Sequence, residues 1–487
     1  MINKTKSVKK NFIMNSILTM SSFIFPLITF PYVSRVLLPS GTGKVSFATS
    51  LISYFNMFAQ LGIPTYGIRA CAKVRDNREE LTRTAQELLF INLIMNIFSY
   101  VTLFIFLMAV PRLRLERTLY IIVSFMILLT SIGMEWLYKA LEQYAYITMR
   151  SIAFKIVALI AMFLLVHNQQ DYVIYGGISI FAASASNILN LINVHKYIDI
   201  KPIGGYDIKK HFKPIAVFFA MACATTVYTH LDTLMLGFMA TDDDIGYYNA
   251  AVRIKTILVS IVTSLGTVLL PRASYYIEQG MDKEFRRICT KALNFVILVA
   301  SPMMVYFIIY AKEGVYFLSG QAYMGSILPM QIIMPTLLFI GVTNILGIQM
   351  LVPMGKEKVV LYSEIAGAVV DVVINALLIP QYTSTGAAIG TLIAEFVVFI
   401  VQFYALRNII VRTFKEFHYN TICVALVVGS VISIFIKVLC LGTFPTLVFS
   451  AILFFGIYGL VLILARESLV DELLSEFVRK IRSNHTR

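Results

Sequence analysis

The segment TFPTLVFSAILFFGIYGLVLIL, residues 443–464, runs through twenty-two residues without a charged side chain. As a helix it matches the roughly 30 Å of hydrocarbon in a bilayer, where an unpaired backbone amide finds no partner. Similar segments recur along the chain and predict about fourteen membrane-spanning helices. They lie near residues 11–33, 45–67, 87–109, 118–138, 146–166, 172–194, 214–239, 247–270, 291–310, 327–351, 359–379, 385–406, 418–440 and 443–464.

The composition of the whole chain agrees with this pattern. Of its 487 residues, 58% are hydrophobic and 14% are charged, whereas an ordinary soluble protein has about 25% charged residues. A single soluble core could not bury this excess, so lipid is the expected solvent for most of the chain. The five cysteines are scattered, which predicts neither a disulfide framework nor a metal site. No cofactor is expected.

The basic residues are distributed unevenly between the predicted loops. Most of the 41 Lys and Arg residues lie at the two ends of the chain and in alternate loops. The opposite loops hold few, namely Arg35, Lys44, Arg112, Arg114, Arg117 and Lys312. Because Lys and Arg collect on the cytoplasmic side, both termini are predicted to be cytoplasmic. The net charge of +14 is then explained by membrane orientation and anionic headgroups, so no nucleic-acid partner is expected.

Two parts of the chain resemble each other. The segment SRVLLPSGTGKVSFATSLI (34–52) parallels LDTLMLGFMATDDDIGYYNAAVRI (231–254), and residues 155–191 parallel residues 371–403. The repetition predicts an all-α protein with a six-helix lobe over 1–200, a second over 201–410 and two more helices over 411–465, with the substrate route between the lobes. The tail, 466–487, reads as an amphipathic helix on the inner membrane surface or as a solvated helix.

Five segments carry a family resemblance: FPLITFPYVSRVLLPSGTGKVSFATS (25–50), GIPTYGIRACAKVRDN (62–77), LDTLMLGFMATDDDIGYYNAAVRI (231–254), LLPRASYY (269–276) and NALLIPQYTSTGAAIGTLIAE (375–395). The chain resembles the polysaccharide-unit flippases of the multidrug, oligosaccharidyl-lipid and polysaccharide exporter superfamily. The resemblance implies fourteen helices in two lobes around a cavity, in a bacterial plasma membrane. It also implies transfer of an undecaprenyl-diphosphate-linked oligosaccharide to the outer leaflet, with membrane lipids and a polysaccharide polymerase as partners.

Basic residues inside the spans are the candidate substrate-binding groups, because cations can replace water around a diphosphate. They are Arg35, Arg150, Lys155, Arg253 and Lys255. For Arg35 and Arg150 the alternative is that the side chain reaches to the lipid headgroups. Arg253 and Lys255 are separated by about 200° around one helix, so both cannot point at Asp232 on the preceding span.

Acidic residues inside the spans are the candidate ion-coupling groups, because a buried carboxylate can take up and release a proton. They are Asp232, Glu364, Asp371 and Glu395. The alternative for Asp232 is a purely structural salt bridge with Arg253, and for the others a structural contact with a polar side chain or a lysine.

Two other functions compete with the flippase. An enzyme acting on lipid-linked sugars would need a sizeable outer loop, whereas the connectors ATDDDIG (240–246) and PQYTSTG (380–386) are short, and Asp242, Asp243 and Asp244 read as a solvated turn. No catalytic motif appears, so an enzyme is not expected. A drug or cation antiporter of the same superfamily would need an acidic, aromatic cavity, and Arg253 and Lys255 favour the lipid carrier over it.

Overall fold

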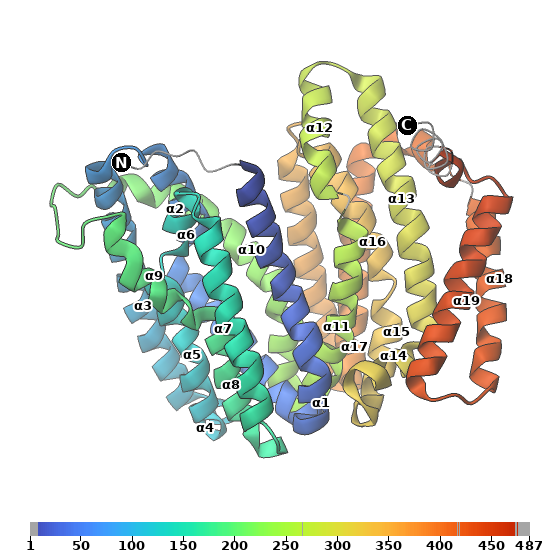
Figure 1. Ribbon diagram of the computed structural model, residues 1–487, viewed down its shortest axis with the longest axis horizontal. Helices are drawn as coiled ribbons and strands as arrows, with labels where there is room; N and C mark the ends of the chain where they lie inside the picture. Colours follow the sequence, from blue (N-terminus) through green and yellow to red (C-terminus); the bar gives the residue numbers. More distant parts are fainter. Residues whose placement is uncertain (1–7, 265, 416, 418, 473–474, 476–487) are drawn as a thin grey trace, which may run out of the picture. The chain divides into compact units, whose positions relative to one another are not determined.

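The computed structural model describes residues 8–264, 266–415, 417, 419–472 and 475, and all regular structure within them is helical (Figure 1). The chain forms two compact units, residues 1–246 and 247–487, and each is described by itself. The all-α fold is thereby confirmed, whereas the predicted lobes over 1–200 and 201–410 stay a prediction.

The first unit contains the helices up to α10 and the start of α11. Their bounds are α1 (Val8–Gln60), α2 (Ile63–Lys73), α3 (Arg78–Ala109), α4 (Pro111–Leu115), α5 (Arg117–Ile132), α6 (Glu135–Ala140), α7 (Tyr144–Leu165), η1 (Gln169–Asp171), α8 (Tyr172–Ile180), η2 (Phe181–Ala185), α9 (Asn187–Asn193), η3 (Val194–Lys196), α10 (Lys209–Met239) and α11 (Asp242–Thr263). Within this unit α1 packs against α3, α5, α7 and α10.

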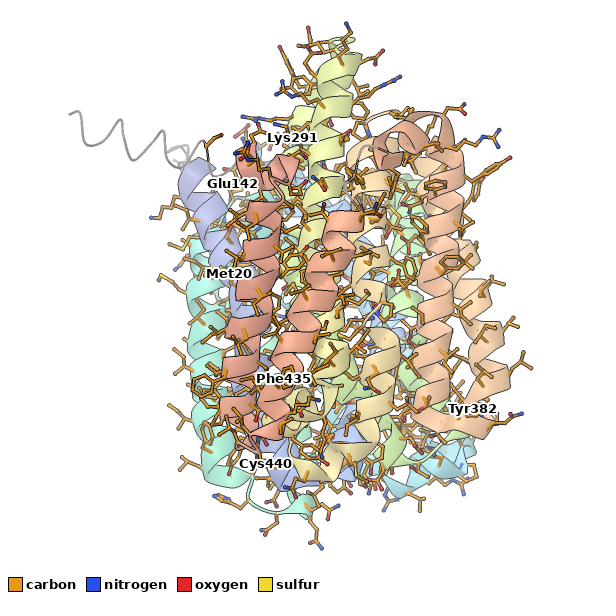
Figure 2. The ribbon with its side chains drawn as sticks, turned by 90° about the vertical axis from the view of Figure 1, so that its right-hand side faces the viewer. Met20, Glu142, Lys291, Tyr382, Phe435 and Cys440 are labelled. Atoms are coloured by element: carbon orange, nitrogen blue, oxygen red, sulfur yellow. The ribbon has the colours of Figure 1, made fainter. Side chains whose placement is uncertain are left out.

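The second unit contains the rest of α11 and the helices that follow it. Their bounds are α12 (Gly266–Glu278), α13 (Asp282–Ile309), α14 (Ala311–Ser319), η4 (Gln321–Ser326), α15 (Ile327–Ile333), α16 (Thr336–Thr343), η5 (Asn344–Leu351), α17 (Glu357–Lys415), α18 (Tyr419–Val438) and α19 (Thr443–Leu464). Lys291 lies at one end of this unit, and Tyr382 and Cys440 lie at the other (Figure 2).

Two helices are too long to cross a bilayer once. α1 has 53 residues and α17 has 59, which correspond to about 80 and 90 Å. Each contains a backbone break, at Leu38 (φ 58°) and at Thr383 (φ 46°). In α17 the chain folds back on itself, since Gly367 lies against Val398 and Gly390 lies against Asn375.

These breaks bear on the number of membrane crossings. Of the helices in the described residues, 11 are long and apolar enough to span, or 12 if the bent pair over 321–351 counts as one span. If each arm of α1 and α17 crosses separately, two more crossings are added. The predicted number of fourteen stays a prediction.

Side-chain polarity in α3 is the reverse of that in a soluble helix. Ile97 and Phe104 are 66% and 61% exposed, whereas Asn92 and Asn96 are buried. The Asn92 amide donates to the carbonyl of Ala59 (2.9 Å), and the Asn96 amide donates to the hydroxyl of Ser131 (2.7 Å). Apolar side chains outside and hydrogen-bonded amide nitrogens inside are the arrangement expected in hydrocarbon. On α18, Phe435 (Figure 2) is likewise 66% exposed.

Two similar turns meet within the first unit. A Cβ atom added to Gly43 would overlap the carbonyl oxygen of Asp242, and one added to Gly246 would overlap the carbonyl oxygen of Pro39. These are the turns of the two segments that resemble each other in sequence. Glycine is required at both positions because the backbones touch.

Some predicted spans differ from the helices observed. Two helices, α5 and α6, cover the predicted span 118–138. They are separated at Met134, whose φ of 42° interrupts the helix. The predicted span 327–351 is bent by 46° between η4–α15 and α16–η5. The helix observed in the predicted span 247–270 ends earlier than predicted, since α11 ends at Thr263. A new helix, α12, begins at Gly266, and glycine is a poor helix former.

The start of the tail docks on the second unit. The Glu467 side chain accepts hydrogen bonds from the backbone amides of Leu469 (2.9 Å) and Val470 (3.0 Å), so it caps a helix. Leu469 and Val470 pack against the core that contains Leu293 and Val296 of α13. Beyond Glu472, all but Ser475 of the predicted amphipathic helix lies outside the described residues.

Candidate substrate-binding site

Arg150 is buried at a junction of α6, α7 and the segment before α9. Its side chain is 3% exposed, and its Nη2 lies 2.9 Å from the carboxylate of Glu135. A second nitrogen, Nη1, donates to the hydroxyl of Ser186 at 2.5 Å. Glu135 also pairs with Lys139 at 2.9 Å. One carboxylate therefore serves two cations, and the cluster carries a net positive charge.

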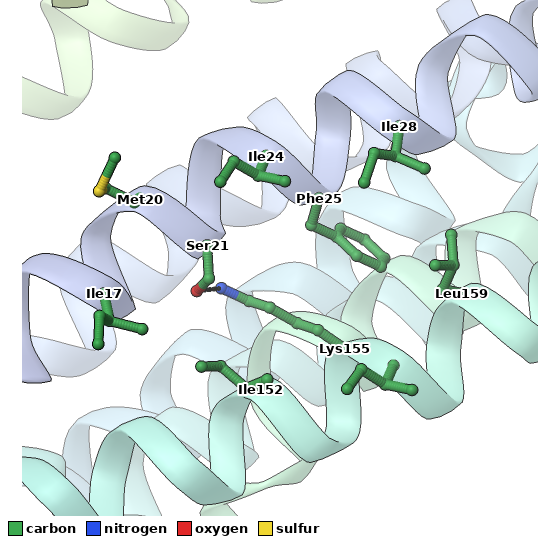
Figure 3. A pocket seen from close by; sticks show the side chains of 10 residues that line it. Ile17, Met20, Ser21, Ile24, Phe25, Ile28, Ile152, Lys155 and Leu159 are labelled. Atoms are coloured by element: carbon green, nitrogen blue, oxygen red, sulfur yellow. Dashed lines mark hydrogen bonds between the residues drawn. The ribbon is translucent and has the colours of Figure 1, made fainter.

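Lys155 lies on the same helix, α7, in an apolar groove against α1 (Figure 3). Its Nζ donates to the hydroxyls of Ser21 (2.9 Å) and Ser22 (3.0 Å). Across the described part of the chain, no carboxylate lies within ion-pair distance of Lys155. Lys155 is thus a cation inside a span whose direct hydrogen-bond partners, among the described residues, are two hydroxyls.

Arg35 occupies a different environment on α1. Its side chain is exposed, and its Nη1 donates to the carbonyl of Pro31 one turn earlier. An exposed arginine near a helix break can contact either a headgroup or a ligand phosphate.

The remaining predicted cations lie on α11. Arg253 and Lys255 are half-buried and belong to the second unit, whereas Asp232 lies on α10 in the first unit. The predicted pairing of Asp232 with Arg253 joins two units and stays a prediction. Asp232 and Arg253 both have polar or electrostatic partners in the structure.

The acidic residues of α17 gather on its two arms. Asp371 is 8% exposed and Glu395 is 2% exposed. Asp371 accepts a hydrogen bond from Asn375 (3.2 Å), and Gly390 of the opposite arm lies against Asn375. Glu364, about two turns before Asp371 on the same arm, is half-buried. The fold therefore brings Asp371 close to the second arm, and the ion-coupling role of these carboxylates stays a prediction.

Another buried carboxylate, Glu87, was not predicted as a functional group. Glu87 of α3 has no exposed side-chain surface and lies 2.8 Å from Lys210 and 2.8 Å from His211 at the start of α10. It also accepts the backbone amide of Asp207 at 2.6 Å. The other ring nitrogen of His211 contacts the Tyr66 hydroxyl of α2 at 2.7 Å. The sequence signal was a carboxylate at the first position of the predicted span 87–109.

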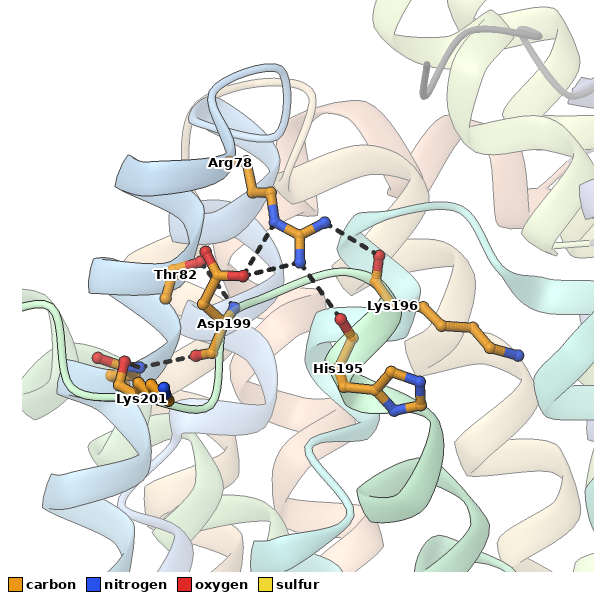
Figure 4. A network of polar contacts seen from close by, with 7 residues as sticks. Arg78, Thr82, His195, Lys196, Asp199 and Lys201 are labelled. Carbon is orange, nitrogen blue, oxygen red and sulfur yellow. Dashed lines mark hydrogen bonds and ion pairs between the residues drawn. The ribbon is translucent and has the colours of Figure 1, made fainter.

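Neighbouring contacts fix the linker before α10. Arg78 of α3 donates to the Asp199 carboxylate (2.9 Å) and to the carbonyls of His195 and Lys196 (Figure 4). Gln86 donates to the carbonyls of Asp199 (2.8 Å) and Lys201 (3.0 Å). The linker is therefore held against α3 at the same end of the first unit as Glu87.

The three aspartates predicted as a solvated turn instead begin α11. Asp242 pairs with Arg112 at 2.9 Å, with both side chains 31% exposed. The Thr241 hydroxyl accepts the backbone amide of Asp244 (3.3 Å) and the Asp244 carboxylate accepts the backbone amide of Thr241 (3.2 Å), so the two residues cap the helix. In the described ranges, no group of three or more His, Cys, Asp or Glu side chains could hold a metal ion.

A polytopic helical protein with cations and carboxylates buried inside its spans has the construction of a multi-pass membrane transporter. The chain belongs to the family described as polysaccharide biosynthesis protein, whose model matches residues 8–277, more than half of the chain. The MatE family model matches residues 216–377. These matches confirm the resemblance to the exporter superfamily.

Relatives and a solved structure agree with this assignment. The chain is 24% identical over 406 residues to the "Putative O-antigen transporter" of Escherichia coli (strain K12), covering 82% of this chain and 97% of the relative. It is 24% identical over 408 residues to the protein of the same name from Shigella dysenteriae, covering 82% and 100%. Its fold is similar to that of "Lipid II flippase MurJ, inward closed conformation", with a TM-score of 0.71 at 16% identity over 93% of this chain and 99% of that one.

Proposed function

We propose that this protein is a flippase that moves an undecaprenyl-diphosphate-linked oligosaccharide from the cytoplasmic to the outer leaflet of a bacterial plasma membrane, for cell-surface polysaccharide export. The observation that carries the proposal is membership of the polysaccharide biosynthesis family over residues 8–277. The names of the two O-antigen transporters support the substrate class. The fold shared with a lipid flippase supports the mode of action.

The cations inside the spans support this proposal on physical grounds. A diphosphate that leaves water needs replacement partners, and Arg150, Lys155, Arg253 and Lys255 lie within spans where they can supply them. The cargo's tail can remain in hydrocarbon throughout. We expect the site to open first inward and then outward, with both termini on the cytoplasmic side and a polysaccharide polymerase acting on the delivered unit.

The carboxylates offer a means of coupling. Asp371 and Glu395 are buried, Glu364 is half-buried, and all three lie on α17. Protonation of such groups in one access state and release in the other would link lipid movement to a proton gradient. Asp232 is the corresponding candidate on α10.

Deletion of the gene followed by analysis of lipid-linked intermediates tests the proposal. We expect complete oligosaccharide units to accumulate on the inner leaflet, where they are protected from reagents added outside intact cells. Accumulation of unpolymerised units already exposed outside would instead indicate an enzyme that acts after transport. Membrane integrity is checked with an impermeant dye.

A drug or cation antiporter is the second candidate, favoured by the MatE match over residues 216–377. Under that function, deletion would increase sensitivity to cationic drugs and leave the distribution of lipid-linked units between the two leaflets unchanged. The same strains therefore discriminate the two candidates.

A further inference from the structure

The groove beside Lys155 is open and apolar. It has a volume of about 360 Å³ and is formed by α1 and α7 alone. Met20 is 59% exposed, Ile24 48% and Ile156 53%, so large apolar side chains form its surface (Figure 3). The lining residues are Ile17, Met20, Ser21, Ile24, Phe25, Ile28, Ile152, Lys155, Ile156 and Leu159. Such a surface suits a hydrocarbon chain.

Lys155 places one positive charge in this hydrocarbon-like surface. It lies near the middle of α7, which runs from Tyr144 to Leu165, so it is about 15 Å from either end of the helix. Its partners are the hydroxyls of Ser21 and Ser22. Glu135, the acid on the neighbouring α6, is already shared between Lys139 and Arg150. An anion is therefore the complementary occupant of the groove.

The depth of Lys155 distinguishes two kinds of anionic lipid. A resident phospholipid keeps its phosphate at the membrane surface, whereas a lipid in transit must carry its phosphate past the middle of the bilayer. An occupant that combines hydrocarbon with a phosphate at this depth is thus the lipid being moved.

Resting on the proposed function, we propose that the groove between α1 and α7 holds the isoprenoid tail of the transported lipid while Lys155 binds its phosphate midway across the membrane. Ser21 and Ser22 hold the lysine in place between transport events. When the phosphate arrives, Lys155 exchanges one hydroxyl contact for a charged one, which is the stronger.

Photolabelling of the full-length protein tests the site without requiring transport. The protein is reconstituted in nanodiscs of phosphatidylcholine with a polyprenyl phosphate that carries a photoreactive diazirine in its tail. We expect label on residues 17–28 and 152–159. Lys155→Ala should reduce the labelling roughly tenfold, the loss of one charged contact, and Lys155→Arg should retain it.

Matched variants separate the groove from general lipid contact. Ile24→Trp fills the groove and leaves the lysine intact, so it should also reduce labelling. Ile97→Trp, on the exposed face of α3 and 66% exposed in the native protein, should not. Unlabelled polyprenyl phosphate should compete with the probe, whereas the same excess of phosphatidylglycerol should not.

Three results would overturn the proposal: equal labelling of wild type and Lys155→Ala, equal labelling of the two tryptophan variants, or displacement of the probe by phosphatidylglycerol, which would mark a resident-lipid site. Flipping is measured separately in vesicles. A protein that labels in the groove but moves no lipid contradicts the proposed function and leaves the site intact, whereas lipid movement with an unlabelled groove contradicts the site alone.

Discussion

At the scale of single residues, Arg150 shows what a cation needs in order to remain inside this protein. Its guanidinium is almost fully enclosed and depends on Glu135 for charge balance. Lys155, five residues later, has no such acid among its partners. The two basic residues, both predicted from the sequence as candidate substrate-binding groups, therefore differ in the role that their surroundings allow.

Replacing Glu135 with Ala should destabilise the first unit, because it leaves Arg150 buried without a carboxylate. We expect a loss of about 2–3 kcal/mol, which is less than for a fully buried pair because Glu135 is itself 35% exposed and water screens the charge. Thermal unfolding in detergent measures the loss. The double variant Glu135→Ala/Arg150→Leu should recover most of it, and Glu79→Ala, from a surface pair in which Glu79 is 70% exposed, should change little.

The Glu87 cluster makes a second prediction at this scale. Glu87→Ala removes the partner of His211, Lys210 and a backbone amide at once, so it should lower the melting temperature by roughly 5 °C or more. Lys210→Ala should have a smaller effect, since Lys210 is 43% exposed and can find water. Equal effects of the two substitutions would contradict the central position of the carboxylate.

The Glu87 cluster also shows where sequence reasoning ends. Glu87 and His211 are separated by 124 positions, and local periodicity carries no information about which distant residues meet. The pair between Glu135 and Arg150 was also missed, although only 15 positions separate the two residues, because it crosses the turn between α6 and α7 and helical periodicity does not extend across a turn. By contrast, the polar gaps predicted between spans near residues 34–44 and 380–384 contain the observed breaks at Leu38 and Thr383, because turn residues act locally.

At the scale of elements, the fold of α17 depends on close backbone contact at its turn. A Cβ atom added to Gly386 would lie 2.6 Å from the carbonyl oxygen of Leu378. Gly386→Ala should therefore push the arms apart and lower the melting temperature by roughly 3–10 °C. Gly456→Ala in α19, where a Cβ meets nothing within 4 Å, is the matched control and should leave the melting temperature unchanged or raise it slightly.

The contact between the tail and α13 predicts a dependence on pH. A hydrogen bond from Lys291 (2.5 Å) lowers the pKa of Glu472 from its ordinary value of 4.5. The bond therefore stabilises docking fully at pH values above 4.5, and this contribution is lost as the pH falls through the lowered value.

Hydrogen exchange of residues 466–472 as a function of pH measures this docking. Exchange should quicken at acidic pH in the native protein. Glu472→Gln should exchange faster at neutral pH and lose that part of the pH dependence. An unchanged profile in the variant would show that another group controls the docking.

At the scale of the whole molecule, the sequence predicted the solvent of the chain and the helical class, because both follow from composition and from the length of apolar runs. It did not determine which charged side chains face a transport route. That property depends on the arrangement of helices from distant parts of the chain, and for Arg253, Lys255 and Asp232 it depends on both units.

Replacing Arg253 and Lys255 together with Ala should abolish polysaccharide export while the protein remains in the membrane at normal abundance. The reason is that two candidate phosphate partners are removed from α11. Export is measured as surface polysaccharide in a complemented deletion strain. The double variant Lys356→Ala/Lys358→Ala removes two basic residues with the same spacing from an exposed position and should export normally. Normal export by the α11 variant would exclude these cations as required groups.

The meeting of the turns at Gly43 and Gly246 has an evolutionary consequence. Each turn presses on the main chain of the other, Gly43 on Asp242 and Gly246 on Pro39. Neither segment can gain bulk or length alone without displacing its counterpart. Related proteins that carry an insertion in one turn should therefore carry a compensating change in the other, so that the two turns change together.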